Sequence, residues 1–360
     1  MVLEHLKIVE LGNTKIGKTT YMASMYGNLQ SIFSKFKLRA VDQQEHDRLL
    51  ELYSFIRKGK YPAPTSQRNR YDFVLQYREK DVLSFNWTDY RGEAVRDKAS
   101  NEDVQALLED LRLADGIMVF FSAIALIKHD KRTNEIGRIN YLLGKAFVNL
   151  ERPISLAIVL TQVDLIGKDD FQANLLEPIK GLIELVELTD KVSGVIIPTA
   201  CGAKMINTRM PVIFALQTRV RFIVDSLNAE YQKYKEKAAS FQKKADEENS
   251  MAGGIRDLWR WFIGETTHGS LAQQNYQLAK EQEEKAQAKL NEWQPLVEPI
   301  NNLDNYTKRL VRIRKGESLQ NYATQCYASQ KNDNELKDWL WFFGMLMLIV
   351  VIIGMFFLAR

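Results

Sequence analysis

The chain has 360 residues, 46% of them hydrophobic, which is enough to form a sizeable core and more than one domain. Its formal net charge of +4 is too small to predict a nucleic-acid partner. The two cysteines, Cys201 and Cys326, and the four scattered histidines lack the spacing of metal ligands. Two cysteines so far apart in the sequence indicate a reducing compartment and exclude a disulfide-rich fold.

The first predicted element is a short buried strand, Leu6–Leu11, which leads directly into the sequence GNTKIGKT. This sequence matches G-x-x-x-x-G-K-[S/T], a loop that binds phosphates at the start of a helix. Lys18 should reach the β- and γ-phosphates, and the Thr19 hydroxyl should hold Mg²⁺. The alternative is a glycine-containing turn with a chance lysine, but it does not account for the flanking strand and helix. The residues predicted to bind the phosphates are Gly12, Asn13, Thr14, Lys15, Ile16, Gly17, Lys18, Thr19 and Thr20.

Two β-rich stretches, Tyr71–Tyr77 and Val82–Thr88, follow a helix predicted at Gln43–Arg57. The polar turn between them predicts an antiparallel hairpin. The second strand ends in Asp89, and Gly92 follows three residues later. Such a pair can bind Mg²⁺ through water and meet the γ-phosphate with a backbone N–H. D-x-x-G alone is a weak motif because many turns contain it, but here it stands at the end of a predicted strand.

Strand and helix patterns then alternate along the chain. The repeated strand-then-helix units predict an α/β fold with a mostly parallel sheet and helices on both faces. A ligand of such a sheet binds at the carboxyl ends of the strands, and the polar motifs fall there. The predicted strands are Gly116–Phe121, Ile154–Leu160 and Gly194–Pro198, and the predicted helices are Val104–Ala114, Asn134–Asn149 and Phe171–Leu188.

The ordered motifs GNTKIGKT, DYRG, TQVD and TACGAK, each after a predicted strand, resemble those of Ras-like P-loop GTPases of the translation-factor-related class. The run from Gly17 to Tyr26 is also similar to the bacterial double-GTPase branch, whose phosphate loop leads into a Thr-Tyr-apolar helix. The resemblance covers about residues 5–225. It implies a Ras-like domain that binds GTP and Mg²⁺ and hydrolyses GTP as a conformational switch.

For guanine recognition, the resemblance points to the TQVD segment. Asp164 matches the family's aspartate, whose carboxylate accepts hydrogen bonds from the guanine ring. Thr161 replaces the family's usual asparagine, and Gln162 replaces the lysine whose stem packs on the base. Ala203 and Lys204 match the short backbone element that touches guanine. If TQVD were only a strand-to-loop turn, an ATPase of another P-loop class would be the alternative.

For catalysis, the resemblance implies roles for Lys18, Thr65 and Glu93. Thr65, with Ser66 as the alternative, lies just before the hairpin, where the family has the threonine that binds Mg²⁺ beside the γ-phosphate. Glu93 stands where the family has the glutamine that orients the attacking water. A carboxylate there repels the γ-phosphate but can act as a base, so hydrolysis is expected to be slow or to depend on a partner. The implied metal ligands are Thr19, Thr65 and Asp89.

The second half of the chain predicts long amphipathic helices. The first is expected to end at Gly253-Gly254 and the second at Pro295 and Pro299, before a third helix around Leu303–Ile313. The two long helices predict an antiparallel hairpin or coiled coil. Its turn, residues 255–264, carries an apolar cluster that would contact a membrane or a partner, or pack against its own hairpin.

An uncharged run of 21 residues, Trp339–Ala359, lies near the C-terminus. As a helix it spans about 30 Å, the thickness of a bilayer core. A buried globular helix is the alternative, but it would normally have a polar face. We therefore expect a GTPase domain at residues 1–227, a helical hairpin at 228–330 and one transmembrane helix at 338–359.

These features predict a membrane-anchored GTP-binding protein whose GTPase domain faces the cytoplasm and whose hairpin passes the nucleotide state to a partner or the membrane. The alternative is a nucleotide-binding scaffold that hydrolyses little GTP and organises a membrane-associated complex. The expected partners are guanine nucleotide, a lipid bilayer through Trp339–Ala359, and a second GTPase, a membrane-associated protein or a second copy of the chain. A nucleic-acid partner is not expected.

Overall fold

The structure is a computed structural model that describes residues 3–31, 35–63, 68–90, 102–148, 150–252 and 254–330. The chain divides into two compact units. One unit runs to Arg219 and resumes at Leu303, and the other is Val220–Asn302. The chain leaves the first unit within helix α9 (Met210–Met251) and returns to it within helix α11 (His268–Thr307). The predicted division at residue 227 falls inside α9, so no break in the helix marks it.

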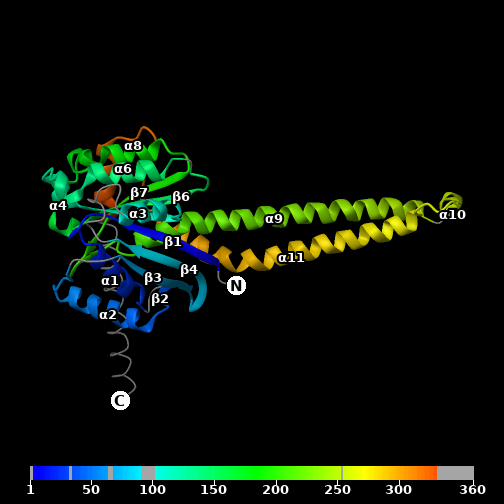
Figure 1. Cartoon of the computed structure of the whole chain (residues 1–360), viewed down its shortest axis with the longest axis horizontal. Helices are drawn as coiled ribbons and strands as arrows, with labels where there is room; N and C mark the ends of the chain where they lie inside the picture. Colours follow the sequence, from blue (N-terminus) through cyan, green and yellow to red (C-terminus); the bar gives the residue numbers. More distant parts are fainter. Residues whose placement is uncertain are drawn as a thin grey trace, which may run out of the picture. The chain divides into compact units, whose positions relative to one another are not determined.

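An eight-stranded sheet, counted over the described residues, forms the middle of the first unit (Figure 1). Its strands are β1 (Leu3–Leu11), β2 (Phe36–Ala40), β3 (Asn69–Tyr77), β4 (Lys80–Asp89), β5 (Gly116–Ser122), β6 (Ile154–Thr161), β7 (Val192–Pro198) and β10 (Val311–Arg312). They lie in the order β10-β7-β6-β5-β1-β4-β3-β2. The five strands from β7 to β4 are parallel, and β10, β3 and β2 are antiparallel to their neighbours. The predicted mostly parallel sheet and its hairpin are confirmed.

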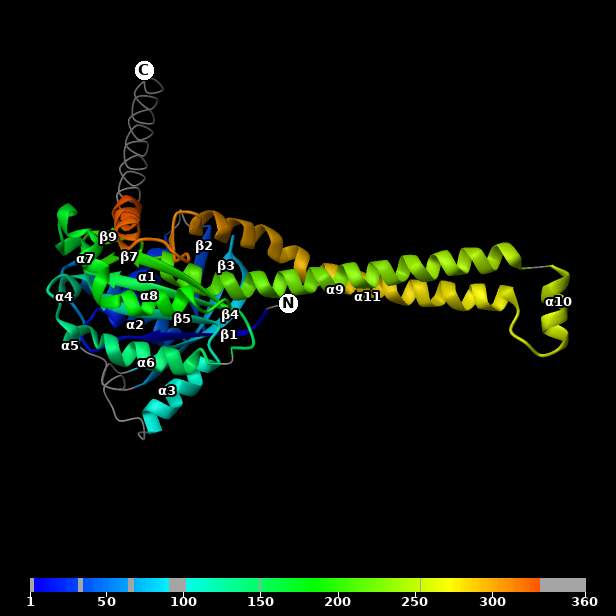
Figure 2. The same cartoon turned by 90° about the horizontal axis from the view of Figure 1, so that it is seen from above.

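Helices cover both faces of this sheet (Figures 1 and 2). One face carries α1 (Lys18–Leu29) and α2 (Gln43–Arg57), and the other carries α3 (Glu102–Arg112), α6 (Ile136–Ala146) and α8 (Lys180–Glu187). All residues of β5 and β6 are buried, as expected for central strands with helices on both sides. Neighbouring residues of β5 point to opposite faces: Phe120 packs against Tyr21 of α1, with ring centroids 5.1 Å apart, whereas Phe121 packs into the core under α3 and α6.

Two predicted helices are divided in the structure. The helix expected at Asn134–Asn149 begins as a short turn, α5 (Lys131–Asn134), and then Glu135, with φ 48°, separates it from α6. The helix expected at Phe171–Leu188 is divided into α7 (Ala173–Leu176), a 3₁₀ turn that contains Pro178, and α8. Proline has no N–H to donate within a helix, which accounts for the second interruption.

The prediction for the segment after the hairpin is wrong in two respects. Helix α11 continues through Pro295 and Pro299 to Thr307. Its buried residues Leu296, Ile300 and Leu303 follow Pro295 and keep the spacing of three and four of one helix face through Pro299. The expected third helix around Leu303–Ile313 is not a separate helix: its first part, to Thr307, belongs to α11, and its last part contains β10, which pairs with the edge of β7. Helix resumes at residues 319–330.

In the second unit, α9 and α11 lie side by side and run antiparallel (Figures 1 and 2), as predicted. A row of buried alanines lines the two helices. Several of them are seven residues apart, the repeat of paired helices, and their small side chains let the two backbones approach closely. They are Ala238 and Ala245 in α9 and Ala272, Ala279 and Ala286 in α11, each at most 6% exposed. A short helix, α10 (Ile255–Phe262), forms the turn between the long helices.

The predicted transmembrane helix at 338–359 lies outside the described residues. Within the described part of the chain, no helix is both long and apolar enough to cross a membrane. The membrane span and the three-part division of the chain therefore stay predictions.

Candidate functional site

The loop between β1 and α1 has the backbone form of an anion-binding site. Lys15, with φ 66°, and Gly17, with φ 96°, have left-handed conformations that turn the chain sharply. Gly12 leaves no room for a side chain, because a Cβ atom there would lie 2.4 Å from Ile16 Cδ1 and 3.0 Å from the Phe120 carbonyl oxygen. Helix α1 begins at Lys18, so its first N–H groups and the positive end of its dipole face the loop.

Lys18 is only 6% exposed and lies inside this loop. Its Nζ donates to the carbonyl oxygens of Gly12, at 3.0 Å, and of Asn13, at 3.2 Å. Phosphate oxygens are stronger acceptors for an ammonium group than neutral carbonyls are. The loop therefore presents one buried cation to an incoming phosphate.

The side chains of two predicted phosphate-binding residues, Asn13 and Ile16, support the loop from behind. The side-chain amide of Asn13 donates to the Thr133 carbonyl oxygen at 2.8 Å, and its oxygen accepts from the Thr14 N–H at 2.8 Å. Ile16 is buried beside Gly12. Neither side chain lines the pocket described below, so their side chains fix the loop to its surroundings.

A buried acidic pair, Glu10 of β1 and Asp89 of β4, lies beside the loop, where the two strands pair in register. Glu10 Oε2 accepts from the Trp87 indole N–H at 3.0 Å, whereas Glu10 Oε1 has no hydrogen-bond partner among the described residues. Burial, and then the charge of Asp89, raise the pKa of Glu10 well above its usual value, against the opposing effect of the Lys18 ammonium. Two carboxylates at this end of the loop fit a bound divalent cation.

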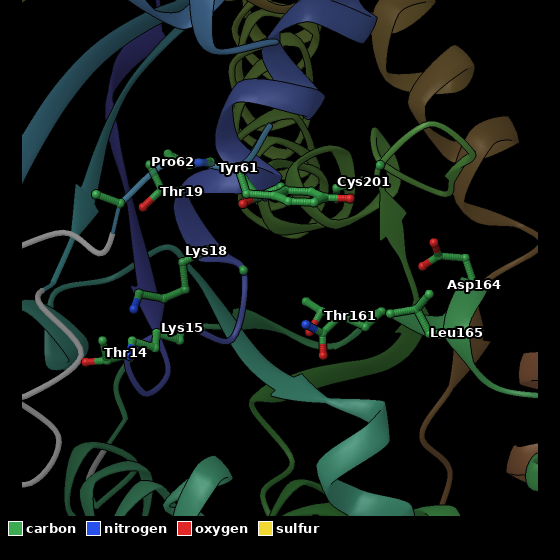
Figure 3. Close-up of a pocket in the computed structure, with 15 residues that line it drawn as sticks. Thr14, Lys15, Lys18, Thr19, Tyr61, Pro62, Thr161, Asp164, Leu165 and Cys201 are labelled. Carbon is green, nitrogen blue, oxygen red and sulfur yellow. The ribbon is translucent and has the colours of Figure 1, made fainter. Parts of the chain in front are cut away.

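A pocket of about 450 Å³ extends from the loop toward the end of β6 (Figure 3). Figure 3 shows Thr14, Lys15 and Lys18 at one end and Asp164 and Leu165 at the other. The residues that line the pocket come from the loop and α1, from the segment before β3, from the end of β6, and from the short strand β8 (Ala200–Cys201) and the residue after it. They are Thr14, Lys15, Gly17, Lys18, Thr19, Thr20, Tyr61, Pro62, Ala63, Thr161, Gln162, Asp164, Leu165, Cys201 and Gly202.

Thr161, at the end of β6, connects the two ends of this pocket. Its hydroxyl oxygen lies 2.8 Å from the Ile16 carbonyl oxygen and 3.1 Å from that of Phe121. Gln162 follows with φ 62°, and its side-chain oxygen accepts from the Ser122 hydroxyl at 2.6 Å. The two residues that depart from the family pattern therefore have defined positions at the carboxyl edge of the sheet.

The wall near Asp164 lies earlier in the chain than predicted. Cys201 and Gly202 line the pocket, and Ala203 and Lys204 do not. The Arg57 guanidinium donates to the carbonyl oxygens of Gly202 and Ala203 and so fixes the backbone of the turn that contains these residues. Burial, and then the charge of Asp164, raise the pKa of Cys201, so the thiol stays neutral and serves as an apolar wall.

Tyr61 is the functional candidate that the sequence motifs missed. It precedes the strand hairpin and is 63% exposed, yet it lines the pocket between the phosphate loop and Cys201 (Figure 3). Its hydroxyl group reaches the turn at Gly202, where a Cβ atom would lie 2.9 Å from the hydroxyl oxygen. The aromatic ring of Tyr61 can stack on a flat ring of a ligand in the pocket. Tyr61 belongs to none of the sequence motifs, so the sequence does not predict this role.

Four predicted residues lie outside the described residues: Thr65, its alternative Ser66, Gly92 and Glu93. Their roles stay predictions. The other phosphate-binding and base-binding candidates line one pocket, apart from Gly12, Asn13 and Ile16 of the loop and Ala203 and Lys204 near its other end.

The model of the family described as Double-GTPase 1 matches residues 9–168. This part of the chain is a P-loop GTPase of the double-GTPase type. The matched range includes the phosphate loop, Asp89 and Asp164. The activity of such a domain is hydrolysis of GTP. The family match ends at residue 168, before Cys201 and Gly202. The place of these two residues in the pocket wall therefore comes from the structure alone.

No curated protein matches the GTPase. Among solved structures, it is similar to the signal recognition particle receptor SRb-GTP/SRX complex from Chaetomium thermophilum, with 11% identity and a TM-score of 0.34 over 56% of this chain and 92% of that one. It is also similar to a GDP-bound NFeoB mutant from S. thermophilus, with 13% identity and a TM-score of 0.32 over 92% of this chain and 99% of that one. TM-scores below 0.5 do not establish a shared fold.

Proposed function

We propose that the protein is a membrane-anchored GTPase that hydrolyses GTP as a conformational switch. The observation that carries nucleotide binding is the pocket that joins Lys18 and Thr19 at one end to Asp164 at the other. Its volume of about 450 Å³ suits a nucleotide-sized ligand.

The two ends of the pocket have separate tasks in this proposal. Lys18 binds the β- and γ-phosphates, and Thr19 and Asp89 hold Mg²⁺, Asp89 through water. When bound, Mg²⁺ neutralises the negative charge that develops on the phosphates. Asp164 accepts hydrogen bonds from the guanine ring, and Tyr61 covers a face of the base in place of the lysine stem that Gln162 does not supply.

The switch itself depends on the segments that contain Thr65, Gly92 and Glu93. Contacts of Thr65 and Gly92 with Mg²⁺ and the γ-phosphate would order these segments, and hydrolysis would release them. With Glu93 in place of glutamine, hydrolysis is slow or depends on a partner.

Competition between nucleotides tests the assignment. The full chain in detergent is titrated with labelled GTP and Mg²⁺, and unlabelled GTP or ATP then competes. Lys18→Ala should weaken GTP binding about 100-fold, because a buried charge-assisted contact is lost. Asp164→Asn should reduce the preference for GTP over ATP about 10–100-fold, because the amide presents a donor where the ring needs an acceptor.

Exposed residues of the same type provide the controls, Lys60→Ala and Asp169→Asn, and neither should change the affinities. If ATP competes as well as GTP against the unaltered chain, Asp164 does not select guanine. If Lys18→Ala binds as the unaltered chain does, the loop does not hold the phosphates.

Membrane attachment is proposed to occur through the uncharged run Trp339–Ala359. Because GTP is a cytosolic nucleotide, the GTPase domain should face the cytoplasm, with the N-terminal end of the run on that side. Membranes that contain the full chain should retain it after alkaline carbonate extraction, and protease added from the cytoplasmic side should remove the GTPase domain. Release by carbonate would show that the run does not span the bilayer.

The helical hairpin is proposed to pass the nucleotide state to a second GTPase, a membrane-associated protein or a second copy of the chain. Support comes from the two helices α9 and α11, each of which is shared with the GTPase unit. Crosslinking of the membrane-embedded chain with GTP and with GDP tests this, since a signalling role requires partners that differ between the two states.

A further inference from the structure

Helix α10 at the turn of the hairpin presents a row of large apolar side chains to solvent. Four of them lie in the helix and one directly after it. We call this set the tryptophan tip. It consists of Leu258, Trp259, Trp261, Phe262 and Ile263, which are 67%, 65%, 70%, 81% and 57% exposed. Packing against its own hairpin, one of the alternatives for this cluster, is therefore wrong.

The apolar residues share one side of the helix. At 3.6 residues per turn, the four that lie in α10 fall within an arc of about 160°. Arg256, Asp257 and Arg260 fall on the opposite side. The helix is thus amphipathic, but its apolar side is the one that water contacts.

The polar side of α10 is held in place by a set of contacts around His268, the first residue of α11. Asp257 Oδ1 accepts from the His268 backbone N–H at 2.6 Å. Arg260 Nη1 lies 3.1 Å from Nε2 of the His268 ring, and the other ring nitrogen bonds the carboxylate of Glu248 in α9. These contacts fix α10 across the end of the hairpin, which is where Figures 1 and 2 show it, so the outward direction of the apolar side is built into the turn.

We propose that the tryptophan tip is a second membrane contact, in which the apolar side of α10 lies in the interface of a lipid bilayer. Trp and Phe side chains on one side of an amphipathic helix favour this interface. The inference rests on the proposed membrane attachment, because the run Trp339–Ala359 would bring the chain to a bilayer. It does not depend on nucleotide binding.

The size and shape of the tip favour lipid over a second copy of the chain. At ~150–250 Å² per aromatic side chain, the three rings offer roughly 400 Å², and the two aliphatic residues still leave the tip below the ~800 Å² per partner of a standard protein interface. Fluid lipid can also surround a helix without a matching groove. Two arginines and two acids, Asp257 and Glu265, cancel in charge, so the attraction should be apolar rather than electrostatic.

A fluorescent non-natural amino acid in the full chain tests the proposal. It replaces either Ile263 in the tip or Glu283, an exposed residue in the middle of α11, as the matched control. The chain is reconstituted into phosphatidylcholine vesicles with and without nitroxide-bearing lipid. The tip label should be blue-shifted and quenched several-fold more than the Glu283 label. Equal, water-like emission of both labels would overturn the proposal.

Three further measurements distinguish an apolar lipid contact from an electrostatic contact and from self-association. The double variant Trp261→Ser/Phe262→Ser should lose the quenching at position 263 yet hydrolyse GTP like the unaltered chain. In 1 M NaCl, where the Debye length is about 3 Å, quenching should persist, and its loss would contradict an apolar contact. A blue shift that grows with protein density and ignores the lipid quencher would assign the tip to a second copy instead. Carbonate extraction reports on Trp339–Ala359 separately, so failure of the anchor and failure of the tip are distinguishable.

Discussion

The two ends of the nucleotide pocket are built from different kinds of residues. At the phosphate end, Lys18 and Glu10 are buried, and Gly12 has no space for a methyl group. At the base end, Tyr61 and Leu165 are 63% and 66% exposed. A buried, close-packed end is fixed before the nucleotide arrives, whereas exposed side chains lose rotamer freedom on binding. Changes at the buried phosphate end should therefore affect stability and catalysis as well as affinity, whereas changes at the exposed base end should affect affinity alone.

The largest expected effect comes from one methyl group at the phosphate end. In Gly12→Ala, the added Cβ meets Ile16 Cδ1 at 2.4 Å and the Phe120 carbonyl oxygen at 3.0 Å, so the loop must move away from β5. A displacement of this kind should lower the rate of GTP hydrolysis about 100-fold, measured by phosphate release under single-turnover conditions.

The matched control is Gly137→Ala in α6, where a Cβ atom would have no neighbour within 4 Å. It should leave hydrolysis unchanged. If Gly12→Ala hydrolyses GTP as fast as Gly137→Ala, the phosphate end is more adaptable than its packing indicates, and the contrast between the two ends is lost.

A smaller effect is expected where the two ends meet, at Thr161. Thr161→Val keeps the shape of the side chain but leaves the Ile16 carbonyl oxygen without its 2.8 Å hydroxyl partner. The loss should destabilise the domain by about 2 kcal/mol, seen in urea unfolding, and should also weaken GTP binding. Thr199→Val provides the comparison, because the Thr199 hydroxyl donates to the Ile197 carbonyl oxygen, two residues earlier, at 3.2 Å. This variant should cost stability without weakening GTP binding. Equal GTP affinities for the two variants would show that the Thr161 hydroxyl group does not support the phosphate loop.

The same contrast between local and distant contacts explains what the sequence could predict. The phosphate loop and the strands β5 and β6 follow from neighbouring residues, through a fixed motif and continuous apolar runs. The two-residue strand β10 could not be predicted, because it exists only through its pairing with β7, more than a hundred residues earlier. Continuation of α11 through Pro295 likewise depends on burial of one face rather than on local propensity.

The base end shows the same limit. Asp164 could be found from its motif, but the wall opposite it was placed two residues too late, at Ala203 and Lys204. Tyr61 was missed because its contact with the turn at Gly202 joins segments that are far apart in the sequence. Tertiary contacts, not local patterns, complete this part of the site.

Removal of the Tyr61 ring sharpens the comparison at the base end. Tyr61→Ala should weaken binding of GTP and ATP alike, about tenfold, since stacking on an aromatic face does not distinguish bases. The ratio of the two affinities should stay the same, in contrast to Asp164→Asn. Tyr141→Ala, a partly exposed tyrosine of α6 away from the pocket, should change neither affinity. A changed GTP-to-ATP ratio in Tyr61→Ala would mean that the hydroxyl group, rather than the ring face, contacts the base.

The smallest expected effect concerns Glu10 and its dependence on pH. Burial and Asp89 raise the pKa of Glu10 in the folded protein above its unfolded value, so the folded state holds this proton more tightly. The resulting stability is fully present below the unfolded pKa and is lost as the pH rises through the folded pKa. Glu10→Gln, which cannot ionise, should lack that loss and gain about 2–4 °C in Tm at pH 8 without nucleotide, or about 1 kcal/mol.

Thermal unfolding between pH 5 and pH 8 measures this difference. The exposed Glu184→Gln of α8 should follow the unaltered chain at every pH. Parallel Tm curves for Glu10→Gln and the unaltered chain would show that the Lys18 ammonium already offsets the burial of Glu10. In that case the charges of Glu10 and Lys18 would balance before Mg²⁺ binds, and the buried carboxylates would not add to the affinity for Mg²⁺. A Tm gain that appears only above the unfolded pKa, and that nucleotide with Mg²⁺ abolishes, would instead show that the charge of Glu10 costs stability in the empty pocket and becomes favourable when the cation is present.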